Sequence, residues 1–413
     1  MQLLHRPPPT AYTAAGSRAS GVIGHSRLWP ATARLARQYT VSPALGLLRS
    51  LVPTARAGQP AVTGPCARNQ LSAYPPRHPP STKLRYHSTP TTAGQNKRNP
   101  SGEPIIHSFF ESKTGSWQYI VADASTRTAV IIDAVLDYDP ATQEISSASA
   151  DALLSLIRKE GYSVSMILET HAHADHFTAA SYLQARLAQE QGGDHRPAIG
   201  IGEHIIQVQR VFGEKYGISP DEYQDVFDKL FKDNETFAVG SLAATALHLP
   251  GHTPDHMGYQ IGNNIFTGDT LFHVELGTAR CDFPFGSAES LYRSGQRLLS
   301  FPSHVRIWAG HDYPPDGPEG RPPVPCTSVG EHREKNKHLK MGVSEKDFVA
   351  LRKGRDDGLA PPRLLHAALQ INIRGGRMPD VMAEGLRLTH LPLKFDGVRW
   401  NGGERTENAS SSA

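Results

Sequence analysis

The chain has 413 residues, of which 38% are hydrophobic and 20% are charged, a balance typical of a globular protein with a sizeable core. This length suits one large domain or two ordinary ones. The sequence contains no run of about 18 apolar residues, so membrane insertion is not expected. Cys66, Cys281 and Cys326 lie far apart in the sequence and form neither a disulfide framework nor a CxxC metal site.

Charge is distributed unevenly along the chain. Residues 1–102 contain 13 Lys and Arg residues and no acidic residue, whereas the remainder holds all 40 acidic residues and 30 of the 43 basic ones. The net negative charge of that remainder argues against nucleic-acid binding. An Arg-rich, Ser-rich and acid-free composition is typical of a mitochondrial transit peptide. We therefore expect residues 1–100 to be a disordered targeting segment, with a processing point near residues 84–89; a plain disordered tail is the alternative.

Beyond residue 104 the chain alternates between strand and helix patterns. Short stretches rich in β-branched and aromatic residues predict strands at 105–110, 117–123, 128–135, 162–170, 198–205, 244–250, 257–262, 264–272 and 305–311. Apolar residues at helical spacing predict helices at 149–161, 178–193 and 289–302, the first with Ser149 as its cap and Gly161 at its end. This interleaving predicts a layered α/β domain over 104–330, with functional groups on loops at strand ends.

The C-terminal part is expected to extend this domain rather than to form a second catalytic unit. Residues 344–358 have a helical pattern, and the apolar run 364–373 is strand-like. We expect 331–400 to pack on the catalytic domain and 401–413 to be a disordered tail.

The sequence MILETHAHADHF, residues 166–177, concentrates metal-binding side chains directly after a predicted strand. His171 and His173 are two residues apart, so in an extended backbone they point to the same side. Asp175 and His176 follow and can reach a neighbouring point. The motif therefore offers ligands to two adjacent sites. A hydrogen-bonded cluster is the alternative, but crowded histidines repel when protonated, and a metal holds them neutral.

Three further ligand-type residues each follow another predicted strand. They are His252 after a Pro-Gly turn, Asp269 in IFTGDTLF and His311 in IWAGHDY. Each residue alone is weak support, but together with HxHxDH they place ligands at the ends of four strands. His256 lies close by, but its step from His252 also suits a helix turn facing solvent, and we leave it out of the ligand set.

In this order, HxHxDH, GH, GD and GHD resemble the motifs of the metallo-β-lactamase fold superfamily, over about residues 104–395. The resemblance implies an αββα sandwich with the metal at one edge, between the two sheets. That fold supports both zinc hydrolases and iron oxygenases, so it does not decide the reaction. The sequences GTARCDFPFG at 277–286, GHDY at 310–313 and the C-terminal extension resemble persulfide dioxygenases rather than glyoxalase II.

The persulfide dioxygenase resemblance implies one Fe(II) per chain, bound by His171, His252 and Asp269. Two histidines and one carboxylate with open positions are also the ligand set expected for non-haem iron oxygenases. The implied substrates are glutathione persulfide and O2, converted to sulfite and glutathione during sulfide oxidation in the mitochondrial matrix. The remaining motif residues would then form hydrogen bonds around the iron or hold a second metal: His173, Asp175, His176 and His311.

The alternative function is a di-zinc hydroxyacylglutathione hydrolase of the glyoxalase II type, with Zn as cofactor. The retained ligand set serves either reaction, so the metal count stays open at this point. The oligomeric state also stays open, with a homodimer among the options.

Residues near the motifs suggest supporting roles. Asp133 matches the superfamily's early aspartate and would fix the HxHxDH loop, unless it is a simple turn residue. Arg280 can receive a glutathione carboxylate or pair with Asp282. Tyr313 is a candidate for lining the glutathione pocket. Cys281 has no activating partner evident in the sequence, which favours a small buried residue over a nucleophile.

Overall fold

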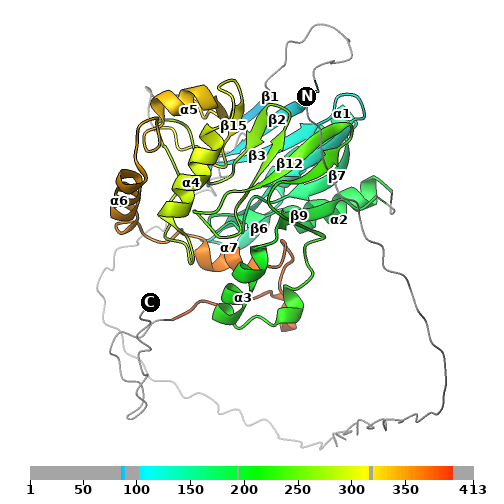
Figure 1. The fold of residues 1–413 in the computed structure, drawn as a ribbon. Coiled ribbons are helices and arrows are strands. Elements are labelled where there is room, and N and C mark those ends of the chain that lie inside the picture. The colour runs from blue at the N-terminus through cyan, green and yellow to red at the C-terminus, as the bar shows by residue number, and fades with distance from the viewer. Residues whose placement is uncertain (1–84, 89–101, 193–194, 316–319, 394–413) are drawn as a thin grey trace, which may run out of the picture. The chain divides into compact units, whose positions relative to one another are not determined.

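The computed structural model describes residues 85–88, 102–192, 195–315 and 320–393, and these form two sheets packed face to face between helices (Figure 1). The first sheet has the order β1-β2-β3-β4-β7-β9-β10 and the second β11-β12-β13-β14-β15-β16, while β6-β5-β8 forms a small third sheet. The predicted αββα sandwich is therefore confirmed. The targeting segment, except for 85–88, and the C-terminal tail lie outside the described residues.

The strands of the first sheet are β1 (Arg85–Ser88), β2 (Ile105–Glu111), β3 (Ser116–Ala122), β4 (Thr128–Ile132), β7 (Ser163–Leu168), β9 (Ala198–Gly202) and β10 (Lys229–Phe231). Those of the second are β11 (Glu235–Val239), β12 (Leu242–His248), β13 (Met257–Ile261), β14 (Asn264–Phe266), β15 (Arg306–Trp308) and β16 (Cys326–Ser328). The small sheet contains β5 (Val135–Asp139), β6 (Glu144–Ser146) and β8 (Phe177–Thr178).

The core between the sheets follows from the alternation of side chains along each strand. On β3, Trp117, Tyr119 and Val121 pack against the second sheet, whereas Ile120 and Ala122 face the helices on the other side. Successive residues of a strand point to opposite faces, so a strand buried on both faces reads as a continuous apolar run. This explains why such short runs identified the strands of the first sheet.

Helices cover both outer faces of the sandwich. The α-helices are α1 (Ala148–Glu160), α2 (Ala180–Glu190), α3 (Ile205–Tyr216), α4 (Ala288–Leu299), α5 (Val329–Lys335), α6 (Glu345–Asp356) and α7 (Leu365–Asn372), with short 3-10 turns at Pro220–Glu222 and Ala383–Gly385. Apolar side chains of α1 and α2 pack on the first sheet, and those of α4, α5 and α6 join the core outside the second. Of the described residues, no helix is both long and apolar enough to span a bilayer.

Two sequence expectations about helices need correction. Helix α1 begins at Ala148, before the expected cap, and Ser149 instead hydrogen-bonds Asp137 through its backbone N–H and its hydroxyl. The run 364–373, expected as a strand, contains helix α7. Its apolar residues fall into two groups at helical spacing: Ala368 and Ile371 join the core under α1 and α2, while Leu369 packs with α3. A helix buried on two sides cannot be told from a strand by periodicity alone.

The sheet also begins earlier than the predicted domain boundary at residue 104. Strand β1 pairs antiparallel with β2, with Arg85 opposite Phe110 and Ser88 opposite His107. This strand lies within the segment assigned to targeting, in the stretch proposed as a processing point. Cleavage after it would remove an edge strand of the first sheet.

Candidate metal centre

All seven predicted ligand-type residues meet at one edge of the sandwich, where β7, β12, β14 and β15 end. Ligand atoms of His171, His252 and Asp269 lie within 4.8 Å of one another, and those of His173, Asp175 and His176 form a second such group. His311 bridges the two groups: its Nε2 is 3.3 Å from Asp175 Oδ2 and 3.4 Å from Asp269 Oδ1. The strand ends thus bring together residues from His171 to His311 that lie far apart in the sequence.

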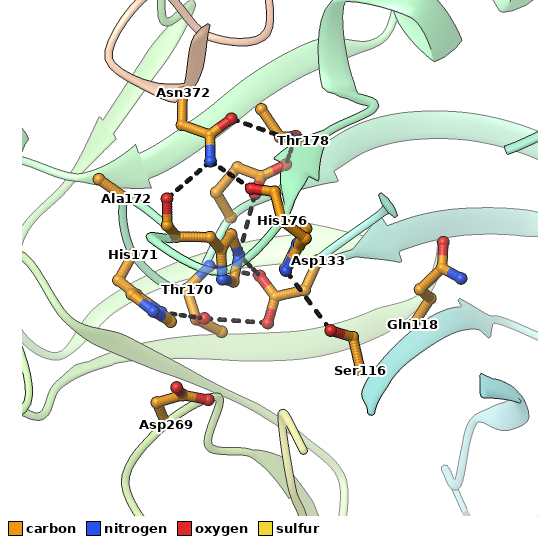
Figure 2. A network of polar contacts seen from close by, with 12 residues as sticks. Ser116, Gln118, Asp133, Thr170, His171, Ala172, His176, Thr178, Asp269 and Asn372 are labelled. Atoms are coloured by element: carbon orange, nitrogen blue, oxygen red, sulfur yellow. Dashed lines mark hydrogen bonds and ion pairs between the residues drawn. The ribbon is translucent and has the colours of Figure 1, made fainter. Parts of the chain in front are cut away.

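Asp133 organises the first half of the HxHxDH loop (Figure 2). Its carboxylate accepts hydrogen bonds from the Thr170 backbone N–H at 2.7 Å and the Thr170 hydroxyl at 2.9 Å. Its Oδ1 also lies 3.2 Å from His173 Nε2. Asp133 has a positive φ of 51°, which aspartate tolerates better than most residues. The carboxylate therefore contacts both the backbone and a ring of the ligand loop, as a turn residue alone would not.

Hydrogen bonds determine which ring nitrogen remains free in His171 and in His252. The Thr170 hydroxyl donates to Asp133, so it accepts from His171 Nδ1 at 3.0 Å and leaves His171 Nε2 with a lone pair. His252 Nδ1 donates to the Arg280 carbonyl at 2.8 Å, which likewise leaves Nε2 free. Burial, reinforced by neighbouring histidines, holds the pKa of His171 well below its usual range, so its imidazole is neutral. Neutral rings with fixed tautomers are what metal ligation requires.

Several buried atoms at this edge have no hydrogen-bond partner among the described residues. They are His171 Nε2, His173 Nδ1, His176 Nε2 and Asp269 Oδ1. Unpaired buried polar atoms cost free energy and are rare in native proteins unless a ligand, ion or water satisfies them. Their concentration at one point, in imidazole and carboxylate groups, fits a bound divalent metal of the transition series.

In the second group, the Asp175 carboxylate already contacts neighbouring histidines. Asp175 Oδ2 contacts His176 Nδ1 at 3.2 Å as well as His311 Nε2. Burial acts to raise the pKa of Asp175, but the neighbouring His311 and His176 outweigh it and hold that pKa well below its usual range. Burial acts to lower the pKa of His311, and Asp269 and Asp175 outweigh it and raise that pKa. His311 thus lies between two carboxylates, which favour its protonated form.

His173 also faces carboxylates. Its Nε2 lies 3.2 Å from both Asp133 Oδ1 and Glu169 Oε2. Burial would lower the pKa of His173, but these two neighbours raise it well above its usual value. Its Nε2–H therefore anchors the ring, and Nδ1 is left without a hydrogen-bond partner among the described residues.

Sequence reasoning left out one histidine that the structure places in the cluster. His256 is fully buried, its ring stacks on His171 at 4.8 Å, and its Nε2 accepts the Asp269 backbone N–H at 2.9 Å. Burial, followed by the charge of His252 and other histidines, holds the pKa of His256 well below its usual range. His256 therefore orients Asp269 instead of facing solvent, and its place in a loop rather than a helix could not be read from spacing. The sequence also showed no sign of the role of Asn372 of α7, whose side chain hydrogen-bonds the ligand loop.

A cavity of about 520 Å³ opens beside the cluster and is lined by His252, Asp269 and His311. Its rim carries Lys113, Arg355 and Arg363, all exposed and without an ion-pair partner within the described part of the chain. The positive rim can attract an anionic ligand and orient it beside the metal ligands.

The other predicted residues around the cavity have mixed environments. Arg280 lines it, but its guanidinium is engaged by the Asp282 carboxylate and donates to the Ala360 carbonyl at 2.9 Å. Tyr313 also lines it and stacks on His311 with ring centres 5.5 Å apart. Cys281 is buried, and burial raises the pKa of its thiol to about 12, which does not suit a nucleophile.

Comparison with known proteins agrees with this geometry. Residues 113–311 match the family model described as the metallo-beta-lactamase superfamily. A "beta-lactamase hydrolase-like protein" of Xylella fastidiosa is 41% identical over 74% of this chain and 68% of its own length. "Glyoxylase B2" of Dictyostelium discoideum is 37% identical over 71% of this chain and 99% of its own length.

Proteins with the name ETHE1 are similar at lower identity. The mitochondrial persulfide dioxygenase ETHE1 of Bos taurus is 27% identical over 67% of this chain and 91% of its own length. The crystal structure of ETHE1 from Myxococcus xanthus aligns with a TM-score of 0.51 and 27% identity, and covers 66% of this chain and 100% of that protein.

Proposed function

Because the chain belongs to the metallo-β-lactamase superfamily, we propose that its metal centre serves an iron-dependent persulfide dioxygenase. The overall reaction consumes glutathione persulfide, one O2 and one water, and yields glutathione, sulfite and two protons. The convergence of two histidines and one carboxylate, His171, His252 and Asp269, carries the proposal. This ligand set with open positions is typical of non-haem Fe(II) oxygenases.

Iron(II) at these residues would supply the redox change that the reaction of O2 with a sulfur substrate requires. The chain's own contribution is to hold the ligands before the metal arrives. Thr170 and the Arg280 carbonyl fix the rings of His171 and His252, and His256 fixes the turn that carries Asp269. Such outer contacts orient ligands and tune their basicity.

The contacts of His311 support one metal per chain. A second ion would draw on the second group, His173, Asp175 and His176, but Asp175 already pairs with His311 at 3.3 Å. Between Asp175 and Asp269, a protonated His311 would offset the negative charge that a second metal would otherwise neutralise. In this arrangement it acts as a hydrogen-bond donor beside the iron ligands.

The cationic rim supports a glutathione derivative as the substrate. Glutathione carries two carboxylates and one ammonium group, so three exposed cations at the cavity mouth, without ion-pair partners among the described residues, favour its carboxylate ends. Lys113 reaches the rim from the turn between β2 and β3, and Arg355 reaches it from α6 of the C-terminal extension. Arg280 is held by Asp282, so within this proposal it shapes the cavity wall and contacts the substrate less directly.

A di-zinc thioester hydrolase acting on a hydroxyacylglutathione is the second candidate. Two observations favour it: the complete second ligand group and the names of the relatives with 37–41% identity. Zinc would lower the pKa of a bound water, and the same cavity would accept the glutathione moiety.

Location in the mitochondrial matrix is part of the proposal. It is supported by the acid-free, basic composition of residues 1–102 and by the mitochondrial designation of the persulfide dioxygenase of Bos taurus. The persulfide substrate would then come from sulfide oxidation in that compartment.

Steady-state kinetics of rim variants test the substrate assignment. In iron-loaded protein, Arg355→Met should raise the KM for glutathione persulfide roughly tenfold, with little change in kcat, because it removes a contact made equally in ground and transition states. Lys346→Met, an exposed residue of α6 outside the cavity lining, is the matched control and should match the unsubstituted protein. Two results would contradict the assignment: an oxygen-uptake rate that does not depend on glutathione persulfide, or equal KM values in the two variants.

A further inference from the structure

The backbone of residues 173–176, which carries the three ligand-type side chains of the second group, lies between β7 and β8 and outside any described strand. Two of its backbone carbonyls accept hydrogen bonds from the same side chain. The Asn372 amide nitrogen donates to the His173 carbonyl at 2.7 Å. It also donates to the His176 carbonyl at 2.8 Å (Figure 2). One amide therefore sets the spacing of two carbonyls three residues apart, with Asp175 between them.

The Asn372 amide oxygen completes the attachment. It accepts the Thr178 backbone N–H at 2.9 Å, so all three polar positions of the amide contact the ligand loop and the strand after it. The Thr178 hydroxyl donates to Glu169 at 2.6 Å, and the other oxygen of Glu169 lies 3.2 Å from His173 Nε2. The backbone carbonyl and the ring of His173 are thus held through one connected network.

Asn372 is the last residue of α7, which lies in the C-terminal extension, and 199 positions separate it from His173. Neighbouring contacts fix the end of this helix. Gln209 of α3 donates to the Ile373 carbonyl at 2.9 Å, and a Cβ on Gly376 would lie only 3.0 Å from the Thr178 carbonyl oxygen. The helix end is therefore pressed against β8, and Asn372 is 3% exposed.

We propose that Asn372 is a positioning residue of the metal centre, through which the C-terminal extension sets the geometry of the ligand loop. The proposal holds for iron or zinc and for either reaction, so it goes beyond the proposed function. Without this amide, two buried carbonyls would lose their donor, and the loop would have to move to satisfy them. That movement would displace Asp175, His176 and the His173 ring together.

Metal titration of the apo-protein tests this role without relying on activity. Asn372→Leu keeps a similar size but removes all three hydrogen bonds. We expect it to bind Co²⁺ roughly 10- to 100-fold more weakly, the usual effect of losing a contact that orients ligands. The visible absorption bands of bound Co²⁺ should also change shape, because they report ligand geometry.

Gln370→Leu is the matched control. Gln370 is equally buried on the same helix, but its amide contacts His366 and His390 instead of the ligand loop. This variant should keep the Co²⁺ affinity and spectrum even if its unfolding midpoint falls. Unchanged Co²⁺ affinity in Asn372→Leu, or an equal loss in Gln370→Leu, would overturn the proposal.

A second substitution covers the case in which Asn372→Leu does not fold. Asn372→Asp keeps the shape and the acceptor for Thr178 N–H but removes both donated hydrogen bonds. It should show the same weakening and the same spectral change. A Co²⁺ affinity equal to that of the unsubstituted protein would again count against a positioning role.

Discussion

Two buried aspartates flank strand β4, one in the turn between β3 and β4 and the other directly after β4, and their carboxylates have different contacts. Asp123, before the strand, accepts hydrogen bonds from Ser125, Thr126 and the backbone and hydroxyl of Ser241, which join turns of the two sheets. Asp133, after it, contacts Thr170 and His173, which lead on to rings with unpaired nitrogen atoms. Both aspartates are 3% exposed, so burial does not distinguish them.

The difference lies in where each network ends. Around Asp123, the neighbouring N–H and O–H groups all donate to the carboxylate, so this network stabilises the fold. Around Asp133 the network stops at His171 Nε2 and His173 Nδ1, which are buried and unpaired within the described residues. A polar network that stops at unpaired buried atoms indicates a place for a ligand, whereas a satisfied one indicates structural support.

Removing a direct ligand should have the largest effect. We expect His252→Ala to lose bound metal and activity together, because one of three protein ligands is gone. His311→Ala should keep most of its iron if one metal is bound, but lose one metal per chain in a two-zinc site. Metal content per folded chain, measured in both variants, checks this; equal loss in the two would argue against a single iron.

Changing Asp133 should have an intermediate effect. Asp133→Asn keeps the shape and tolerates the positive φ, but it weakens the anchoring of Thr170 and His173. We expect metal affinity to fall roughly 10- to 100-fold. Titration of the apo-protein with Zn²⁺ or Co²⁺ measures this, and an unchanged affinity would mean that Asp133 is only a turn residue.

The matching change at Asp123 should affect the stability of the fold alone. Asp123→Asn should lower the free energy of unfolding by about 1–3 kcal/mol, because buried donors lose a charged acceptor. Metal affinity should stay the same. Denaturant unfolding of the apo-protein measures the free energy of unfolding. A loss of metal binding in Asp123→Asn would contradict a purely structural role for Asp123.

The effect at Asp123 should also depend on pH. Burial acts to raise the pKa of Asp123, but hydrogen bonds from Ser241, Ser125 and Thr126 outweigh it and hold the pKa well below its usual range. A lowered pKa in the folded state adds stability above the unfolded value of about 4, and this is lost as the pH falls toward the folded pKa. The stability difference from Asp123→Asn should therefore be full at pH 7 and shrink below about pH 4.

The seven ligand-type residues could be predicted from the sequence because they follow short apolar strands and stand in local motifs, and the family resemblance of these motifs implied the sandwich. The rest depended on contacts between distant segments. Asn372 meets the ligand loop only after α7 docks, and the apolar pattern of that helix even suggested a strand. His256 was visible but ambiguous, because spacing does not show whether a ring is buried. The pairing of Arg280 with Asp282 was one of two alternatives that spacing left equal.

Metal exchange tests the central claim most directly. The same apo-protein would be loaded with Fe²⁺ or with Zn²⁺, and sulfite formation and oxygen uptake would be measured with glutathione persulfide. We expect both to track iron content and to vanish in the zinc form, because zinc has no accessible redox change. Full turnover of a hydroxyacylglutathione thioester by the zinc form without oxygen, together with no sulfite from the iron form, would contradict the dioxygenase and establish the hydrolase.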